Sequence, residues 1–312
     1  MLCPALVSFL NETRSVESAA AWNDRSCSHL WLYNLHYFDD LVAEGAPSRE
    51  QWHRGLMDRW VRENPPGVGV GWEPYPVSLR VVNWVKWALA GGVLDDACVH
   101  SLAVQARWLM RHIEWRLLGN HLWANAKALV FAGAFFTGKE AQAWLGRGAS
   151  ILSSELDEQI LPDGGHFERS PMYHSIVLED VLDLLNLRNA YAAGLGERLD
   201  DVCACITALV PRMLAWLAAM SHPDGEISFF NDATTGIAPS PAALEAYAER
   251  LGFPPVPLPS DGITHLAATG YIRLQRGPAV AILDVGEIGP AYLPGHAHAD
   301  THGGATWTCS RP

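Results

Sequence analysis

Apolar residues recur at helical spacing through most of this chain, from about residue 48 to residue 250. The first series consists of Leu102, Ala106, Leu109 and Ile113, at i, i+4, i+7 and i+11. A longer series consists of Val202, Ile206, Leu209, Met213, Trp216, Leu217 and Met220. Such spacing places the apolar side chains on one side of a helix. A third, leucine-rich helix is expected from about Ser175 to Ala193.

The period changes after the proline-rich segment "LGFPPVPLPSDG", residues 251–262. In "GYIRLQRGPAVAILDVGEIG", Ile272 and Leu274 alternate with polar residues, and the chain turns at Gly277-Pro278 before the apolar run Val280–Val285. Alternation around a turn predicts a β-hairpin. We therefore expect a mainly α protein with a helical domain over 1–252 and the start of an antiparallel β-domain over 253–312.

The composition fits a folded protein with a large core, since 49% of the 312 residues are hydrophobic and 18% are charged. A net charge of −12 without a basic stripe excludes nucleic acid as a partner, and an acidic ligand would need local cations. Thirteen tryptophans can serve core packing or sugar stacking. The six cysteines have no framework spacing, so free thiols are expected. Neither a membrane span nor a signal peptide is predicted.

Four stretches combine histidine, carboxylate, amide and aromatic side chains: "GNHLWANAKAL" (119–129), "DGGHFERSPMYHS" (163–175), "DGEISFFND" (224–232) and "GHAHAD" (295–300). Each has an ordinary structural explanation. An Asn-His pair at a helix start can be a cap, and Asp-Gly is a common turn. Their combination and order are more informative than any one of them.

Five strings in the same order resemble the heparinase II/III-like family, and more narrowly its members encoded with bacterial exopolysaccharide and capsule biosynthesis. They are "LWLYNLHYFDDL", "WEPYPVSLRVVNW", "GNHLWANAKALVFAGAFF", "DGGHFERSPMYHSIVLEDVLDLL" and "GHAHADT". The resemblance implies an incomplete α/α toroid of helical hairpins followed by an antiparallel β-sandwich. It also implies β-elimination of a uronic-acid-containing polysaccharide, a partner that is acidic, and a place in the cell envelope or periplasm.

The resemblance further implies roles for single residues. The family's neutralising Asn or His, which faces the uronate carboxylate, corresponds to Asn120 and His121. Its catalytic tyrosine corresponds to Tyr173, and a further catalytic histidine to His296. The second histidine of the H-x-H motif, His298, matches a ligand of a structural metal, usually zinc.

β-Elimination explains why these residue types are needed. The C5 proton lies next to a carboxylate, and hydrogen-bond donors on that carboxylate stabilise the enolate as charge moves onto it. Tyr173 would act as base, and Tyr173 or His296 would protonate the leaving oxygen. Since tyrosine has an ordinary pKa of about 10, a cationic neighbour has to lower it.

Three basic residues are expected to supply local positive charge and to bind the substrate: Lys127, Arg169 and His174. Arg169 and His174 are also, with His296, the candidate cations beside Tyr173. They would provide locally the charge that the acidic chain lacks overall.

The chain departs from the family pattern after Asp300. The ending "HGGATWTCSRP" lacks strand alternation and does not match the family's continuation, so a truncated β-domain is expected. The family's remaining metal ligands, an Asp and a His, would have counterparts only if Asp300 or His302 replaced them. We expect an incomplete zinc site and reduced activity, because His296 would lack the sheet that positions it.

Two other functions remain open. A glycoside hydrolase on the same scaffold would draw a carboxylate pair from Asp163, Glu168, Glu226 and Asp232. A turn role is the competing explanation for Asp163 and for Asp224, since glycine follows each of them. A glycan-binding protein without catalysis would keep the aromatic residues alone. An unsaturated uronate product forms only by elimination, and it distinguishes the lyase from both alternatives.

Overall fold

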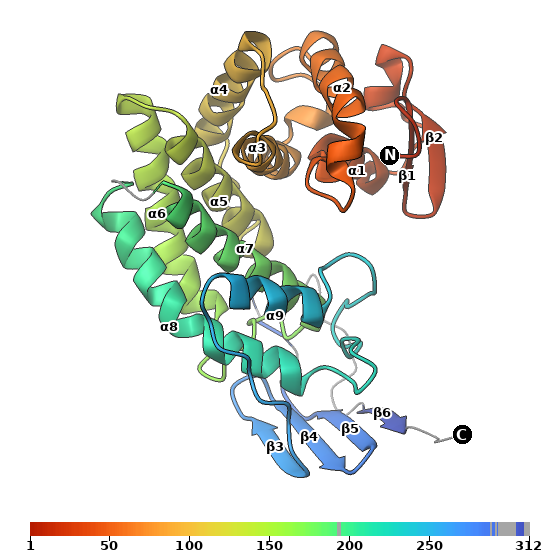
Figure 1. Cartoon of the computed structure of the whole chain (residues 1–312), viewed down its shortest axis with the longest axis vertical. Coiled ribbons are helices and arrows are strands. Elements are labelled where there is room, and N and C mark those ends of the chain that lie inside the picture. The colour runs from red at the N-terminus through yellow and green to blue at the C-terminus, as the bar shows by residue number, and fades with distance from the viewer. Residues whose placement is uncertain (192–194, 288, 291, 293–303, 309–312) are drawn as a thin grey trace. The chain divides into compact units, whose positions relative to one another are not determined.

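The computed structural model describes residues 1–191, 195–287, 289–290, 292 and 304–308 (Figure 1). The chain divides into two compact units, Met1–Ile151 and Leu152–Pro312. Helix α6 (Lys139–Gln159) belongs partly to each unit. The fold is mainly helical, with a small antiparallel sheet near the C-terminus, as the hydrophobic pattern predicts.

The first unit contains a short β-hairpin and five complete helices among its described residues. The elements are β1 (Leu6–Phe9), β2 (Glu12–Ser15), α1 (His29–Tyr37), α2 (Glu50–Glu63), α3 (Pro74–Leu89), α4 (Asp96–Arg111) and α5 (Gly119–Phe135). Short 3₁₀ turns lie at Ala19–Asn23, Asp39–Leu41, Ala46–Arg49 and Val70–Trp72. Helix α5 is buried along most of its length and packs against α3 and α4.

A fully buried arginine joins several elements of the first unit. Arg80 donates from Nε to Gln105 Oε1 (2.9 Å), from Nη1 to the His36 carbonyl (3.1 Å) and from Nη2 to the Gly71 carbonyl (2.8 Å). Its guanidinium also lies 3.8 Å from the ring centroid of Trp60. All three guanidinium nitrogens are therefore satisfied, as a buried charge requires. These contacts fix the positions of α1, α3 and α4 relative to one another.

The second unit packs helices against one face of an antiparallel sheet. Its elements are α7 (Pro171–Ala190), α8 (Glu197–Ala219), α9 (Pro241–Arg250), β3 (Gly262–Leu266), β4 (Tyr271–Arg276), β5 (Ala279–Asp284) and β6 (Gly304–Thr308). The strand order is β3-β4-β5-β6. The end of α8 and the sheet share a core cluster that includes Trp216, Tyr271 and Ile282. Arg273 on β4 donates to the Ala219 and Ser221 carbonyls (3.0 and 2.7 Å), which closes the end of α8.

The predicted hairpin is present as β4 and β5, but the sheet is larger than the alternation indicates. The ending "HGGATWTCSRP" contains a strand in spite of its missing alternation, because β6 pairs with β5 in the register Val280↔Trp307. Backbone hydrogen bonds make this pairing, and they require no alternation of side chains. Helix α7 begins at Pro171, about four residues earlier than expected, because the Ser170 hydroxyl caps it by accepting from the Tyr173 N–H (3.4 Å).

Helix α8 is the one described helix whose length and composition would allow it to cross a membrane. Half of its most apolar window is buried inside the protein. Its buried residues include Ile206, Met213 and Trp216, which come from the series that predicts one apolar helix face. Packing in the second unit thus explains why this helix is so apolar.

Candidate functional site

Asn120 and His121 lie half-buried in the first turn of α5. The helix starts without a side-chain cap, and Leu118 just before it has a positive φ of 55°. For a residue with a Cβ this conformation costs about 1–3 kcal/mol, and such strain concentrates at functional sites. The unusual helix start therefore coincides with the two residues expected to bind a uronate carboxylate.

His121 is held from two sides. Its Nδ1 lies 3.1 Å from Glu114 Oε1, and its ring centroid lies 4.5 Å from that of Tyr75. About 28% of the His121 side chain is exposed, compared with 12% of Glu114. Since the Glu114 carboxylate occupies Nδ1, Nε2 is the ring nitrogen left to face a ligand.

Glu114 is itself fixed by Asn125, a fully buried residue of α5. The Asn125 Oδ1 accepts from the Glu114 N–H (2.8 Å), and its Nδ2 donates to Glu114 Oε2 (3.1 Å) and to Ser78 Oγ (3.0 Å). Neither Glu114 nor Asn125 is among the residues that the sequence patterns single out. The signal that could have found Asn125 is a second asparagine at helical spacing from His121, inside the string "GNHLWAN".

Lys127 lies one turn further along α5 from Trp123 and is only 6% exposed. Its Nζ lies 5.6 Å from the ring centroid of Phe131. The side chain therefore packs within the first unit, and it would have to move before it could contact a polymer. Direct binding of substrate by Lys127 stays a prediction.

A group of aromatic and acidic residues in the same unit comes from the first two family-like strings. The Tyr33 hydroxyl donates to Glu73 Oε2 (2.5 Å), and His29 Nε2 lies 3.1 Å from Glu73 Oε1. The Tyr33 and Tyr75 rings are stacked with centroids 6.4 Å apart. Burial and the hydrogen bond to Glu73 raise the pKa of Tyr33. Tyr75 thus connects this group to His121, a link that the sequence does not reveal.

Tyr173 lies half-buried in the first turn of α7, in the second unit. Burial raises the pKa of its phenol, and the negative charges of Asp232 and Glu168 raise it further. This direction is opposite to the lowering that a tyrosine base needs. The expected lowering by a cationic neighbour is therefore wrong for the neighbours that the structure describes. His296 and His298 lie outside the described residues.

His174 is a core residue rather than a cation beside Tyr173. Its ring is fully buried, with Nε2 3.0 Å from the Met213 carbonyl and its centroid 4.4 Å from Trp216. Burial lowers the pKa of His174 to about 4, so the ring is neutral at pH 7. A neutral ring without exposed surface does not contact a substrate in solvent, so the expected substrate contact is corrected to a role in joining α7 to α8.

Arg169 retains hydrogen-bond donors for an anion. Among the described residues, its buried Nε and Nη1 have no hydrogen-bond partner, although the side chain as a whole is half-buried. Its carbonyl accepts from the Tyr271 hydroxyl (2.7 Å) and from Asn231 Nδ2 (3.4 Å). Arg169, Asn231 and Asp232 all have positive φ, at 60°, 47° and 59°. A carboxylate or sulfate would satisfy the guanidinium donors that the described part of the chain leaves unpaired.

The predicted site residues thus fall into two sets. Asn120, His121 and Lys127 belong to the first unit, while Arg169, Tyr173 and His174 belong to the second. Within the second unit, Glu168 from the same string "HFERSPMYH" and Asp232 from the later stretch "DGEISFFND" both lie near enough to Tyr173 to affect its phenol.

Comparison with known proteins identifies the family. The family model described as heparinase II/III N-terminus matches residues 51–250, and the model described as heparinase II/III-like, C-terminal matches residues 259–303. The chain belongs to the heparinase II/III family. The resemblance of the five strings to the heparinase II/III-like family is thereby confirmed.

Three proteins indicate how far the likeness extends within the heparinase II/III family and its fold. Heparin-sulfate lyase of Bacteroides stercoris is 34% identical over 122 residues, which is 37% of this chain and 17% of the relative. FtsZ-localized protein C of Caulobacter vibrioides is 27% identical over 275 residues, 85% of this chain and 44% of the relative. A crystal structure of a heparan sulfate lyase HepC mutant from Pedobacter heparinus has a TM-score of 0.62 at 21% identity. The match covers 96% of this chain and 51% of the HepC chain.

The match covers only part of the length of each of these relatives. The chain spans less than half the length of the curated relatives it matches, and about half of the solved HepC structure. The HepC structure shares 21% sequence identity with this chain, and a likeness at this level establishes a shared fold. A second solved protein, heparinase III, has a TM-score of 0.61 at 19% identity and covers 90% of this chain and 48% of its own.

Hydrogen bonds show the role of two aspartates in this heparinase II/III chain: Asp163, which was considered for hydrolysis, and Asp224, which is also followed by glycine. Asp163 Oδ2 accepts from the N–H groups of Ala268 (3.0 Å) and Thr269 (2.7 Å) and from the Thr269 hydroxyl (2.9 Å). Its Oδ1 accepts from the Gly165 N–H (3.1 Å). Asp224 likewise accepts from the Glu226 N–H (3.0 Å). The turn explanation is therefore confirmed for both aspartates, and Asp163 is not available as a catalytic acid.

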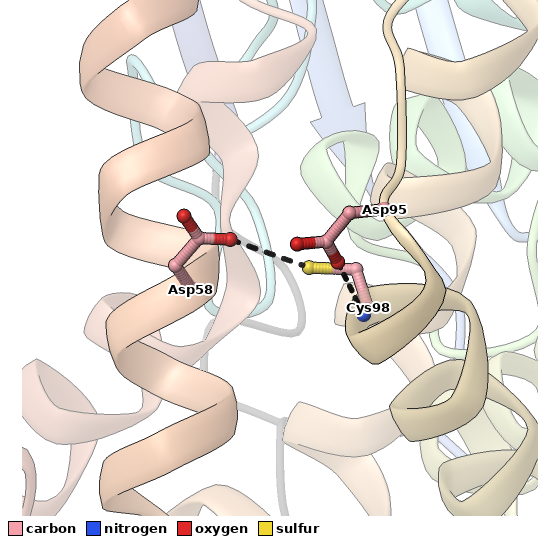
Figure 2. Close-up of side chains that lie close together, drawn as sticks. All are labelled: Asp58, Asp95 and Cys98. Atoms are coloured by element: carbon pink, nitrogen blue, oxygen red, sulfur yellow. Dashed lines mark hydrogen bonds between the residues drawn. The ribbon is translucent and has the colours of Figure 1, made fainter.

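One group of potential metal ligands stands out among the described residues: Asp58, Asp95 and Cys98 (Figure 2). Asp95 caps α4 by accepting from the Cys98 N–H (2.7 Å), and the Cys98 thiol donates to Asp58 Oδ1 (3.9 Å). Burial, with the two nearby carboxylates, raises the pKa of Cys98 to about 12. The hydrogen bonds of the helix cap and of the thiol already explain why these three side chains lie together, so we assign them no metal role. The group caps a helix and joins α2 to α4.

Proposed function

We propose that this chain is a polysaccharide lyase that cleaves a uronic-acid-containing polysaccharide by β-elimination. Family membership supports this function, and the start of α5 is the single observation that carries it. There Asn120 and His121 stand together at an uncapped helix N-terminus, next to a strained Leu118. The partial positive charge of a helix N-terminus adds to the hydrogen bonds that both side chains can offer to a carboxylate.

In the first step, Asn120 and His121 would bind the carboxylate attached to C5 of the sugar. As the C5 proton leaves, negative charge moves onto that carboxylate, and both donors become stronger partners for it. Glu114 keeps His121 oriented through Nδ1, so that Nε2 can donate to the substrate. Glu114 does not have to move during the reaction, because Asn125 already holds it in place.

In the second step, a proton is delivered to the leaving glycosidic oxygen. The raised pKa of Tyr173 keeps its phenol protonated at neutral pH, which suits a general acid better than a general base. We assign Tyr173 to the leaving oxygen and proton abstraction to His296. Arg169 would bind a neighbouring acidic group of the polymer. His298 would hold a structural zinc ion, and no step of the reaction is routed through it.

For the substrate we propose an acidic polysaccharide of the exopolysaccharide or capsule type, on the basis of the five strings. We place the reaction at the cell envelope, where such polymers are made and exported. Loop shape rather than the motifs would select the individual polysaccharide.

The test is ultraviolet absorbance of unsaturated uronates during incubation with a panel of uronate polysaccharides. We expect an absorbance rise with the unaltered protein and its loss in the Tyr173→Phe and Asn120→Ala variants. Tyr191→Phe is the matched control, because Tyr191 lies at the other end of α7 and is half-buried like Tyr173. Reducing ends that accumulate without an absorbance rise would show hydrolysis and contradict the proposal.

A glycan-binding protein without turnover is the second candidate. The observation that favours it is the pair of carboxylates that raises the pKa of Tyr173. In that case, oligosaccharides would bind with equal affinity to the unaltered protein and to Tyr173→Phe, and no product would form. Binding combined with product formation would exclude this candidate.

A further inference from the structure

The segment 112–118 between α4 and α5 carries an unusual tryptophan. Trp115 is 51% exposed, and no other tryptophan whose burial is described is exposed to that degree. Nine tryptophans are buried, which shows that core packing explains most of the high tryptophan content. An exposed indole contributes nothing to that core, so Trp115 calls for a different explanation.

Trp115 stands on a fixed base rather than on a loose loop. The preceding Glu114 is bound by Asn125 through both its backbone N–H (2.8 Å) and its carboxylate (3.1 Å). Inside the segment, the Trp115 N–H donates to the Ile113 carbonyl (2.9 Å) and the Leu117 N–H to the Glu114 carbonyl (3.1 Å). A ligand that binds such a preformed surface loses little free energy to ordering the protein.

The exposed charge of this segment is positive although the chain carries a net charge of −12. Arg116 is exposed, and so is Arg111 at the end of α4, directly before the segment. The one acidic side chain of the segment, Glu114, is 12% exposed and bonds inward to His121 and Asn125. Arg116 makes no ion pair within the part of the chain that the structure describes. Its charge is therefore available to an acidic ligand.

We propose that Trp115 and Arg116 form a binding subsite for one acidic sugar residue. The apolar face of the pyranose ring stacks on the exposed indole, and its carboxylate or sulfate pairs with the Arg116 guanidinium. The subsite lies five positions before Asn120 in the sequence, on the segment that Glu114 ties to His121. It rests on the proposed function for the identity of the polymer, and it adds a determinant of which polymers bind.

The test measures fluorescence polarisation of fluorescein-labelled octasaccharides of heparan sulfate, hyaluronan and alginate, with a chitin oligosaccharide as the uncharged probe. All variants carry Tyr173→Phe to prevent cleavage.

Trp115→Ala removes the stacking surface, so we expect roughly three- to tenfold weaker binding of acidic and uncharged probes. Arg116→Gln removes only the charge, so we expect about fivefold weaker binding of the acidic probes alone. Leu117→Ala is the matched control, since Leu117 is also 51% exposed on the same segment, and its affinity should stay within about twofold.

Two results would overturn the subsite: equal affinities for Trp115→Ala and Leu117→Ala, or no binding of any probe by the parent protein. Failure of the proposed lyase gives a different pattern. In that case the parent protein without Tyr173→Phe forms no unsaturated product, while binding of the probes and its loss in Trp115→Ala persist.

Discussion

The starts of α5 and α7 look alike in sequence but differ in what they present to solvent. Each places two neighbouring residues with chemical potential in its first turn, Asn120 and His121 in one case and Tyr173 and His174 in the other. At α5 both residues are half-buried, and a carboxylate supports the histidine. At α7 only the tyrosine reaches solvent, and the histidine is in the core. Adjacent positions of a motif therefore need not share one function.

The largest expected effect tests the α5 side of this comparison. Asn120→Ala should lower turnover by roughly 100- to 1,000-fold, because it removes a donor from the carboxylate on which charge develops. Its melting temperature should stay within about 1 °C of the parent value, since the side chain is half-exposed. Product absorbance and thermal unfolding measured on the same preparation check this. A large fall in melting temperature would show that Asn120 is structural.

The next effect concerns the turn that leads to α7. Asp163→Ala should lower the free energy of unfolding by about 2–4 kcal/mol, because donors of Ala268 and Thr269 lose their acceptor. Urea unfolding gives this value. The matched control is Asp224→Ala, which removes a single described hydrogen bond from an exposed turn, to the Glu226 N–H. Equal losses for the two variants would contradict the bridging role of Asp163.

The α7 side of the comparison also predicts a dependence of stability on pH. Burial lowers the pKa of His174 in the folded protein to about 4, below its ordinary value of 6.5. The unfolded chain therefore binds this proton first, and stability is lost as the pH falls from about 6.5 to 4. The His174→Gln variant should lose less stability over that window, which unfolding in urea at each pH would show. Parallel curves for the variant and the parent would mean that other groups account for the acid sensitivity.

His36 is a matched case in the first unit. It is fully buried, and its pKa is lowered to about 3, mainly by burial. Its Nε2 bonds to the Trp22 carbonyl (2.9 Å), and its Nδ1 accepts from Trp60 Nε1 (2.9 Å). A His36→Gln variant should reduce the acid sensitivity over a wider range, down to about pH 3. This would separate the contributions of the two units.

The smallest expected effect concerns the group Asp58, Asp95 and Cys98. Added Zn²⁺ should shift the melting temperature of the parent protein and of Cys98→Ala by the same amount, because the helix cap and the contact between α2 and α4 account for these side chains without an ion. A shift that Cys98→Ala abolishes would show a metal site here.

Much of the scaffold was predictable because long helices carry many repeats of one pattern. The series from Val202 to Met220 predicts α8, and the alternation around Gly277 predicts β4 and β5. Strand β6 was not predictable in this way, because its pairing depends on the backbone of β5 rather than on its own side chains. The start of α7 depends on one capping serine, Ser170, which the leucine pattern does not include.

The candidate site was predictable only as a set of residue types. Sequence strings locate Asn120, His121 and Tyr173, but burial decides what each can do. The motif places His174 next to Tyr173, whereas the helical rotation between neighbours turns His174 toward Trp216. Glu114 escapes detection because its partners, His121 and Asn125, lie seven and eleven residues away.

The proline-rich segment 253–261 looks like a domain boundary, or seam, at which the helices and the sheet could be exchanged between proteins. The hydrogen bonds of the second unit argue otherwise. Thr269 holds Asp163 and accepts from Trp216 Nε1 (3.0 Å), and Tyr271 holds the carbonyl of Arg169 (2.7 Å). A graft at the seam would have to bring both residues with it. The sheet and the loop before α7 therefore have to be moved together when this scaffold is recombined.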